Sequence, residues 1–183
     1  MKKFISVLLT IVLCLFTAIS AFAAETASIS LETEIEVPVV YFDSTPEYQQ
    51  YLNELENESA LQRATRGATT ISAAVIRNGS SSGCELYLNW TGDELYSGFR
   101  YKKITVKSTS ILFPTTYGTF GNGSSYTTQN VTAAAIGSVK IGNVTIDNNV
   151  TSVKVSSSGL QGYNMQSASW LSAVEFAGTV TIN

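Results

Sequence analysis

The chain has 183 residues, a formal net charge of −3 and no histidine. Without imidazole it cannot build a His-based nucleophilic triad, and zinc and copper lose their commonest ligand. The small net charge leaves too few cations to offset a run of phosphates, so we expect no nucleic-acid partner.

The first 23 residues predict a secretory signal peptide. Two lysines precede an apolar run over residues 4–16, and a small-residue site favours cleavage between Ala23 and Ala24. An uncleaved anchor is the alternative, because residues 4–24 are uncharged and just long enough to cross a bilayer. We expect a secreted, extracellular protein, from a bacterial source given the short Lys-Lys start, with no membrane contact once the signal is removed.

Cysteine usage predicts a domain held together by its core. Cleavage removes Cys14 and leaves Cys84 alone, so no internal disulfide can form. Cys84 lies in phase with apolar neighbours and is predicted to be a buried thiol, although a bridge between chains stays open. Residues 67–183 are enough for one hydrophobic core.

Residues 24–66 form an acidic segment before a change of composition at Arg66-Gly67. They carry nine acids against two arginines, whereas residues 67–183 carry seven cations against five acids. Residues 44–47 are typical of a helix start, with a hydroxyl cap, an early proline and an acid in the first turn. A short apolar stripe at helical spacing follows: Tyr48, Tyr51, Leu52 and Leu55.

Two interpretations of this acidic segment stay open. It is either a pro-segment cut between Arg66 and Gly67, or a permanent part of the fold or a tethered tail, which we favour because Arg-Gly is common in linkers. The predicted domains are therefore a signal peptide over 1–23, an acidic, partly helical leader over 24–66, and a β-domain over 67–183.

Residues 67–183 alternate with the period of β-strands. Apolar residues from Cys84 to Trp90 share one face, and together with residues 70–77 they predict a hairpin. Val139 and Ile141 would face opposite to Val144 and Ile146 in a continuous strand, so we predict a two-residue turn at Gly142-Asn143.

The rest of the domain completes an all-β prediction. Asp147-Asn148-Asn149 predicts a turn, Val153 and Val155 predict a strand that closes over residues 156–159, and residues 174–182 predict a last strand in which Gly178 marks a bulge or a close backbone approach. About eight to ten strands favour an antiparallel β-sandwich of the general immunoglobulin-like or jelly-roll type.

Catalytic and metal patterns are weak. Gly79–Gly83 fits the G-x-S-x-G pattern but lacks a base and a following helix, so we interpret it as a Ser/Gly loop. The segments Asp93-Glu94 and Asp147-Asn148-Asn149 resemble loop caps as much as calcium ligands. We therefore predict no catalytic residue, no metal and no cofactor. A carboxylate hydrolase using Asp93, Glu94 and Glu175 is an alternative.

A polar surface carrying tyrosines and cations is the best candidate for binding. Tyr87 should face away from the core, and other tyrosines stand beside small or polar residues. The predicted binding residues are Tyr87, Tyr96, Tyr101, Arg100, Lys102, Lys103 and Tyr163. Cross-strand pairing and a charged, aggregation-resistant sheet edge are the structural alternatives.

These patterns favour a secreted, non-enzymatic β-sandwich that binds a glycan, a cell-wall polymer or a protein at the cell surface or in the medium. The first alternative is a small secreted toxin or bacteriocin-like effector that residues 24–66 hold inactive. The second is the carboxylate-based glycoside hydrolase.

Overall fold

The computed structural model describes residues 35–62, 69–79 and 82–182, and these belong to one compact unit. The predicted signal peptide and the possible cut between Arg66 and Gly67 lie outside the described residues. Within those residues, no helix is both long enough and apolar enough to cross a membrane.

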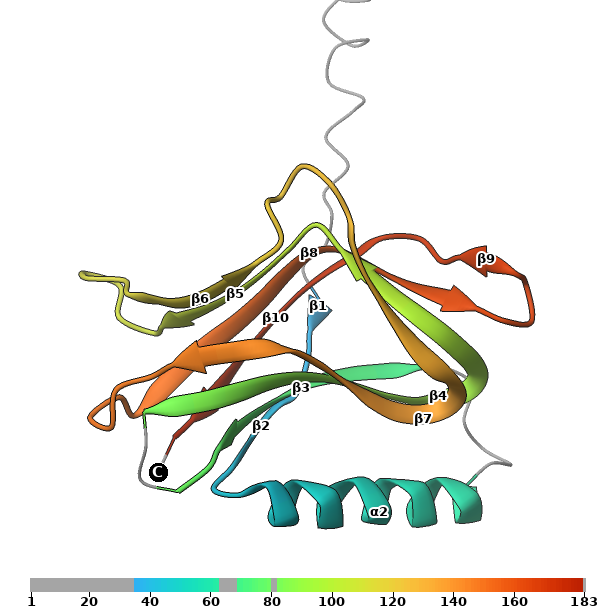
Figure 1. Cartoon of the computed structure of the whole chain (residues 1–183), viewed down its shortest axis with the longest axis horizontal. Coiled ribbons are helices and arrows are strands. Elements are labelled where there is room, and N and C mark those ends of the chain that lie inside the picture. Colours follow the sequence, from blue (N-terminus) through green and yellow to red (C-terminus); the bar gives the residue numbers. More distant parts are fainter. Residues whose placement is uncertain (1–34, 63–68, 80–81, 183) are drawn as a thin grey trace, which may run out of the picture. The chain divides into compact units, whose positions relative to one another are not determined.

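The described chain is mostly β, with one helix, as Figure 1 shows. Its elements are β1 (Ile35–Glu36), β2 (Val39–Phe42), α2 (Thr45–Gln62), β3 (Thr70–Arg77), β4 (Gly83–Tyr101), β5 (Lys103–Ser108), β6 (Thr116–Phe120), β7 (Thr127–Thr145), β8 (Ser152–Asn164), β9 (Ser169–Trp170) and β10 (Val174–Thr181). The all-β prediction is confirmed. The sheet is mixed, because β1 pairs with β10 and β2 pairs with β3 in parallel.

The strands form two groups that share one core. The first runs in the order β1-β10-β8-β5-β6, and the second in the order β2-β3-β4-β7. The far end of β8 also pairs with the far end of β4, which joins the groups into a single ten-stranded arrangement. The main core draws on both groups, for example Val75 and Leu86 from the second and Val106, Val155 and Phe176 from the first.

The β3–β4 hairpin is confirmed. Ile71 pairs with Trp90 and Arg77 pairs with Cys84. Every second residue from Cys84 to Trp90 is at most 2% exposed, so the predicted core face is correct. The opposite face of β3 is buried as well, because α2 covers it (Figure 1).

The predicted turn at Gly142-Asn143 is wrong, because β7 runs through it. Leu86 pairs with Gly142 and Tyr87 with Lys140, so Ile141 is an extra residue, a β-bulge. The bulge changes the phase of the strand and lets both Ile141 and Val144 point inward. The sequence signalled the change of face correctly, but a bulge and a turn both produce it.

The predicted end of the next strand at residues 156–159 is also wrong. β8 continues to Asn164, and Gly159 takes a left-handed conformation (φ +64°) inside it. The stem of Lys102 lies where a side chain at Gly159 would be. Both the left-handed backbone and this close approach therefore require glycine. The last strand is confirmed as β10. Gly178 is a close approach, because a Cβ there would lie 2.3 Å from the Val37 carbonyl oxygen.

Helix α2 begins where the sequence predicts. The Glu47 amide donates to Ser44 Oγ (3.4 Å), as in a capping box, while the Glu47 carboxylate accepts from the amide of Asp43, one residue before the cap (3.1 Å). Tyr48 is fully buried in a small cluster with Phe42, Ala74 and Ile76. Its hydroxyl donates to the side-chain oxygen of Asn89.

Residues 35–62, expected as a leader, thus contribute two strands and a docked helix to the compact unit. An isolated helix of this length is marginal in water, and the sheet supplies the apolar face that it needs. Cleavage after Arg66 stays a prediction.

Candidate binding surface

Three of the seven predicted binding residues lie in one cluster. Arg100, Lys102 and Tyr163 are linked through the rings of Tyr126 and Trp170, where β4, β7, β8 and β9 lie next to one another. We name this surface the Arg100 platform; its residues are Arg100, Lys102, Tyr126, Gln161, Tyr163 and Trp170.

Strand register explains why these residues share a face. Arg100 of β4 pairs with Thr128 of β7 on one side and with Gln161 of β8 on the other. Directly opposite residues in antiparallel strands point to the same face. The residues before and after it in β4, Phe99 and Tyr101, are buried, so Arg100 points to the opposite, outer face of the strand.

The guanidinium of Arg100 packs against two rings. Its central carbon lies 4.4 Å from the ring centre of Tyr126 and 4.3 Å from that of Trp170. Arg100 Nε donates to Gln161 Oε1 (2.7 Å), and Gln161 Nε2 in turn donates to the Leu171 carbonyl (2.7 Å). The Lys102 ammonium lies 5.6 Å from the Tyr126 ring. The guanidinium plane and its free edge are therefore fixed in direction.

The β8–β9 turn places Trp170. Buried Asn164 accepts hydrogen bonds from the amides of Gln166 (2.8 Å) and Ser167 (3.2 Å), which closes the turn. The Trp170 ring then lies over Gly98, where a Cβ would be 3.6 Å from it, and meets Tyr163 edge-on at 5.3 Å. The small residue in β4 makes room for the large one in β9.

Two predicted binding residues are not at the surface. Tyr96 and Tyr101 are each 2% exposed, so their expected exposure is wrong. Tyr101 follows the alternation around Arg100. Tyr96 turns inward at an irregularity between residues 96 and 98 of β4 and stacks on Phe99 at 5.6 Å. Burial raises the pKa of Tyr96, whose hydroxyl contacts Thr69 and Glu94.

The other two lie elsewhere. Tyr87 does point away from the main core, but α2 half-covers it, and its ring lies 4.9 Å from that of Tyr48. Its expected exposure failed because the helix docks on that face. Lys103 is exposed at the start of β5 and runs beside Gly123.

The remaining sequence candidates are acids on β4, on β10 and in the turn after β7. Glu94 accepts a hydrogen bond from the Tyr96 hydroxyl (2.9 Å), Asp93 is exposed and Glu175 is half-buried. The predicted turn at Asp147 is closed by its backbone carbonyl, which accepts a hydrogen bond from the Val150 amide (3.0 Å). No cluster of three or more metal-ligating side chains occurs in the part of the chain that the structure describes.

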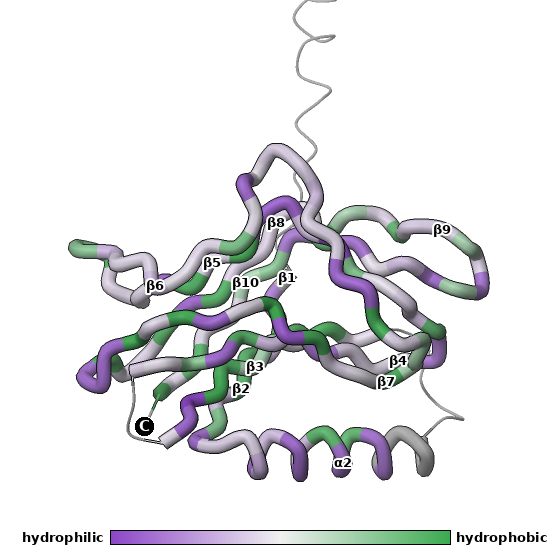
Figure 2. The backbone as a smooth tube through the Cα atoms, in the orientation of Figure 1, coloured by the Kyte–Doolittle hydropathy of each residue, from purple (hydrophilic) through white to green (hydrophobic). Residues whose placement is uncertain are grey.

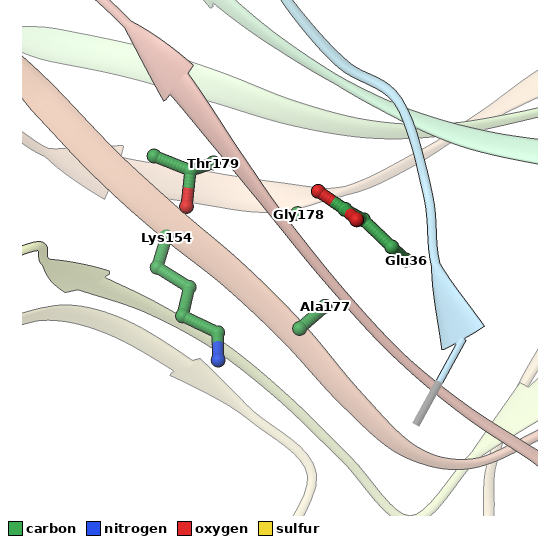
Figure 3. A pocket seen from close by; sticks show the side chains of 5 residues that line it. All are labelled: Glu36, Lys154, Ala177, Gly178 and Thr179. Atoms are coloured by element: carbon green, nitrogen blue, oxygen red, sulfur yellow. The ribbon is translucent and has the colours of Figure 1, made fainter. Parts of the chain in front are cut away.

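A depression on β10, shown in Figure 3, is one alternative site. It holds about 270 Å³, and Glu36 and Lys154 flank it on opposite sides of the strand. Its floor is made by Ala177 and Gly178, with Thr179 at the edge. It offers one carboxylate and no aromatic ring, so it has fewer binding groups than the Arg100 platform.

Sequence reasoning did not single out Gln161, Trp170 or Tyr126 as binding residues. No local signal marks Gln161. Trp170 gives a weak local signal. It is a large aromatic residue among small and polar residues, so its neighbours in the sequence offer little apolar surface for it to pack against. No protein-family model, curated protein or solved structure matches the chain.

Proposed function

We propose that this chain is an exported, non-enzymatic β-sandwich protein whose Arg100 platform binds an acidic glycan, such as an anionic cell-wall polymer. The signal-like residues 1–23 support export, and the core shared by two groups of strands supports the sandwich. The observation that carries the binding proposal is the stack in which Arg100 packs against Tyr126 and Trp170.

The chemistry of the stack favours an acidic sugar. The guanidinium lies over two rings, its Nε donates to Gln161, and within the described chain its two terminal NH₂ groups make no hydrogen bond. Such an edge suits bidentate contact with a carboxylate, sulfate or phosphate. Lys102 adds a second cation, and the partly exposed rings offer flat faces against which the CH groups of a pyranose can pack.

The test is direct binding, by calorimetry, to a uronic-acid polysaccharide and to a neutral polysaccharide of similar length. We expect binding to the acidic polymer only. Arg100→Lys keeps the charge but loses the fork, and Trp170→Ala removes one ring, so each should weaken binding about tenfold. Lys140→Gln, which removes an exposed cation outside the platform, should change nothing. Equal binding by Arg100→Lys and the unchanged protein would reject the proposal.

The toxin alternative requires that residues 24–66 be cut off and dissociate from the rest of the protein. The burial of Tyr48 and the pairing of β2 with β3 support a segment that stays attached even after a cut at Arg66. Activity against neighbouring cells that appears only after removal of this segment is the result that would favour the toxin.

A further inference from the structure

The loop between β5 and β6 exposes three consecutive large apolar side chains. Ile111, Leu112 and Phe113 are 95%, 83% and 82% exposed, whereas Leu95 and Met165, exposed apolar residues elsewhere, are only 42% and 46% exposed. Figure 2 shows this hydrophobic tip at the far end of the hairpin. Single exposed apolar residues are ordinary, but a contiguous group of this kind marks an interaction surface.

Hydrogen bonds hold the tip in shape. The Ser108 amide donates to the Thr115 carbonyl (2.8 Å), and the Thr115 amide donates to Ser108 Oγ (2.8 Å). The Phe113 amide donates to Ser110 Oγ (3.2 Å), which turns the chain at the end of the loop. The hairpin therefore presents its apolar residues in a defined arrangement.

Cations stand at the base of the tip. Lys107 of β5 pairs directly with Lys154 of β8, and both are exposed. Cations in this position are suited to attract an anionic surface toward the tip. The sequence holds no acid from Leu95 to Ile146, so the whole hairpin is cationic.

We propose that the β5–β6 tip inserts into the surface of an anionic phospholipid bilayer. The tip protrudes, as a group that enters a lipid interface must, and it is far too short to span one (Figure 1). Apolar side chains would enter the boundary between headgroups and acyl chains while Lys107 and Lys154 stay at headgroup level. This inference is independent of the Arg100 platform. It departs from the expectation of no membrane contact, which considered only spanning segments.

Vesicle flotation tests the proposal with the purified chain, its N-terminus defined by intact mass. We expect binding to vesicles of phosphatidylglycerol and phosphatidylcholine in equal parts, and much weaker binding to phosphatidylcholine alone. Leu112→Ser with Phe113→Ser should lower binding at least about tenfold. The matched pair Leu95→Ser with Met165→Ser removes two exposed apolar residues elsewhere and should bind normally. Lys107→Gln should lower binding about fivefold.

The proposal is overturned if Leu112→Ser with Phe113→Ser binds vesicles as well as Leu95→Ser with Met165→Ser. Equal binding would also be the result if residues 1–23 were still attached and bound the vesicles themselves. Phe113→Trp supplies a second measurement, because its emission should shift to the blue on anionic vesicles. An unshifted emission also overturns the proposal. Sedimentation gives a third outcome that overturns the proposal: the unchanged protein is a dimer and the variant with Leu112→Ser and Phe113→Ser is a monomer. The tip would then belong to an interface between copies.

Discussion

Tyr48 is the residue through which α2 depends most on the sheet. Its ring lies 5.3 Å from that of Phe42 and 4.9 Å from that of Tyr87, and no part of the residue reaches solvent. Tyr48→Ala removes this ring from a closed space that the backbone cannot refill. By comparison with other buried aromatic truncations, the free energy of unfolding should fall by about 3–5 kcal/mol.

Tyr48→Phe separates the hydroxyl from the ring. The phenylalanine keeps the packing but leaves the side-chain oxygen of Asn89 without its donor, and Asn89 is fully buried. An unpaired buried acceptor costs about 1–3 kcal/mol, so this variant should lie between the unchanged protein and Tyr48→Ala. Tyr48→Ala exceeds it because it loses the packing as well.

Urea unfolding followed by tryptophan fluorescence measures both variants, because Trp90 reports from the main core, on the other face of the sheet. Gln49→Ala changes an exposed residue on the same helix and should stay within about 0.5 kcal/mol. A loss below about 1 kcal/mol for Tyr48→Ala would refute the reasoning, since a truncated buried aromatic normally costs several times more. Residues 45–62 would then be detachable from the core, and the pro-segment hypothesis would gain.

Three further predictions follow from burial. Gly178→Ala should destabilise the protein by about 1–3 kcal/mol in the same assay, because the new methyl group would press on the Val37 carbonyl; an unchanged midpoint contradicts this. Cys84 is 1% exposed and should react with a thiol reagent only in urea, as peptide mass mapping can show; labelling in buffer would mean that the strand opens. Burial raises the pKa of Tyr48, and raises that of Tyr41 to about 12 with help from Asp43. Unfolded tyrosines lose their protons first, near pH 10, so stability should fall as pH rises beyond about 10, and a flat profile of urea midpoints from pH 9 to about 11 would count against it.

The candidate site was only partly predictable. Local composition placed Arg100 and Lys102 in a cationic, aromatic segment, and the structure links them to Tyr163 through the rings of Trp170 and Tyr126. Trp170 and Gln161 come to the same surface because β8 bends to pair with β4, and β9 folds back over Gly98. Pairings between segments about 60 residues apart leave no trace in a local pattern. Tyr96 was predicted to be exposed because its sequence neighbours are polar. An irregularity in β4 turns its side chain into the core instead.

The sequence by itself determined the strands at residues 70–77 and 174–182, the cap of α2 and the core face of Cys84 to Trp90, and it narrowed Gly178 to a bulge or a close approach. These depend on neighbouring residues, whose preferences act over a few positions. Only the tertiary structure decided that Ile141 forms a bulge where a turn was predicted, that α2 covers Tyr87, and that Trp170 stacks on Arg100. Each of these depends on which distant strand or helix lies next to the residue, and burial against that partner outweighs the local preference.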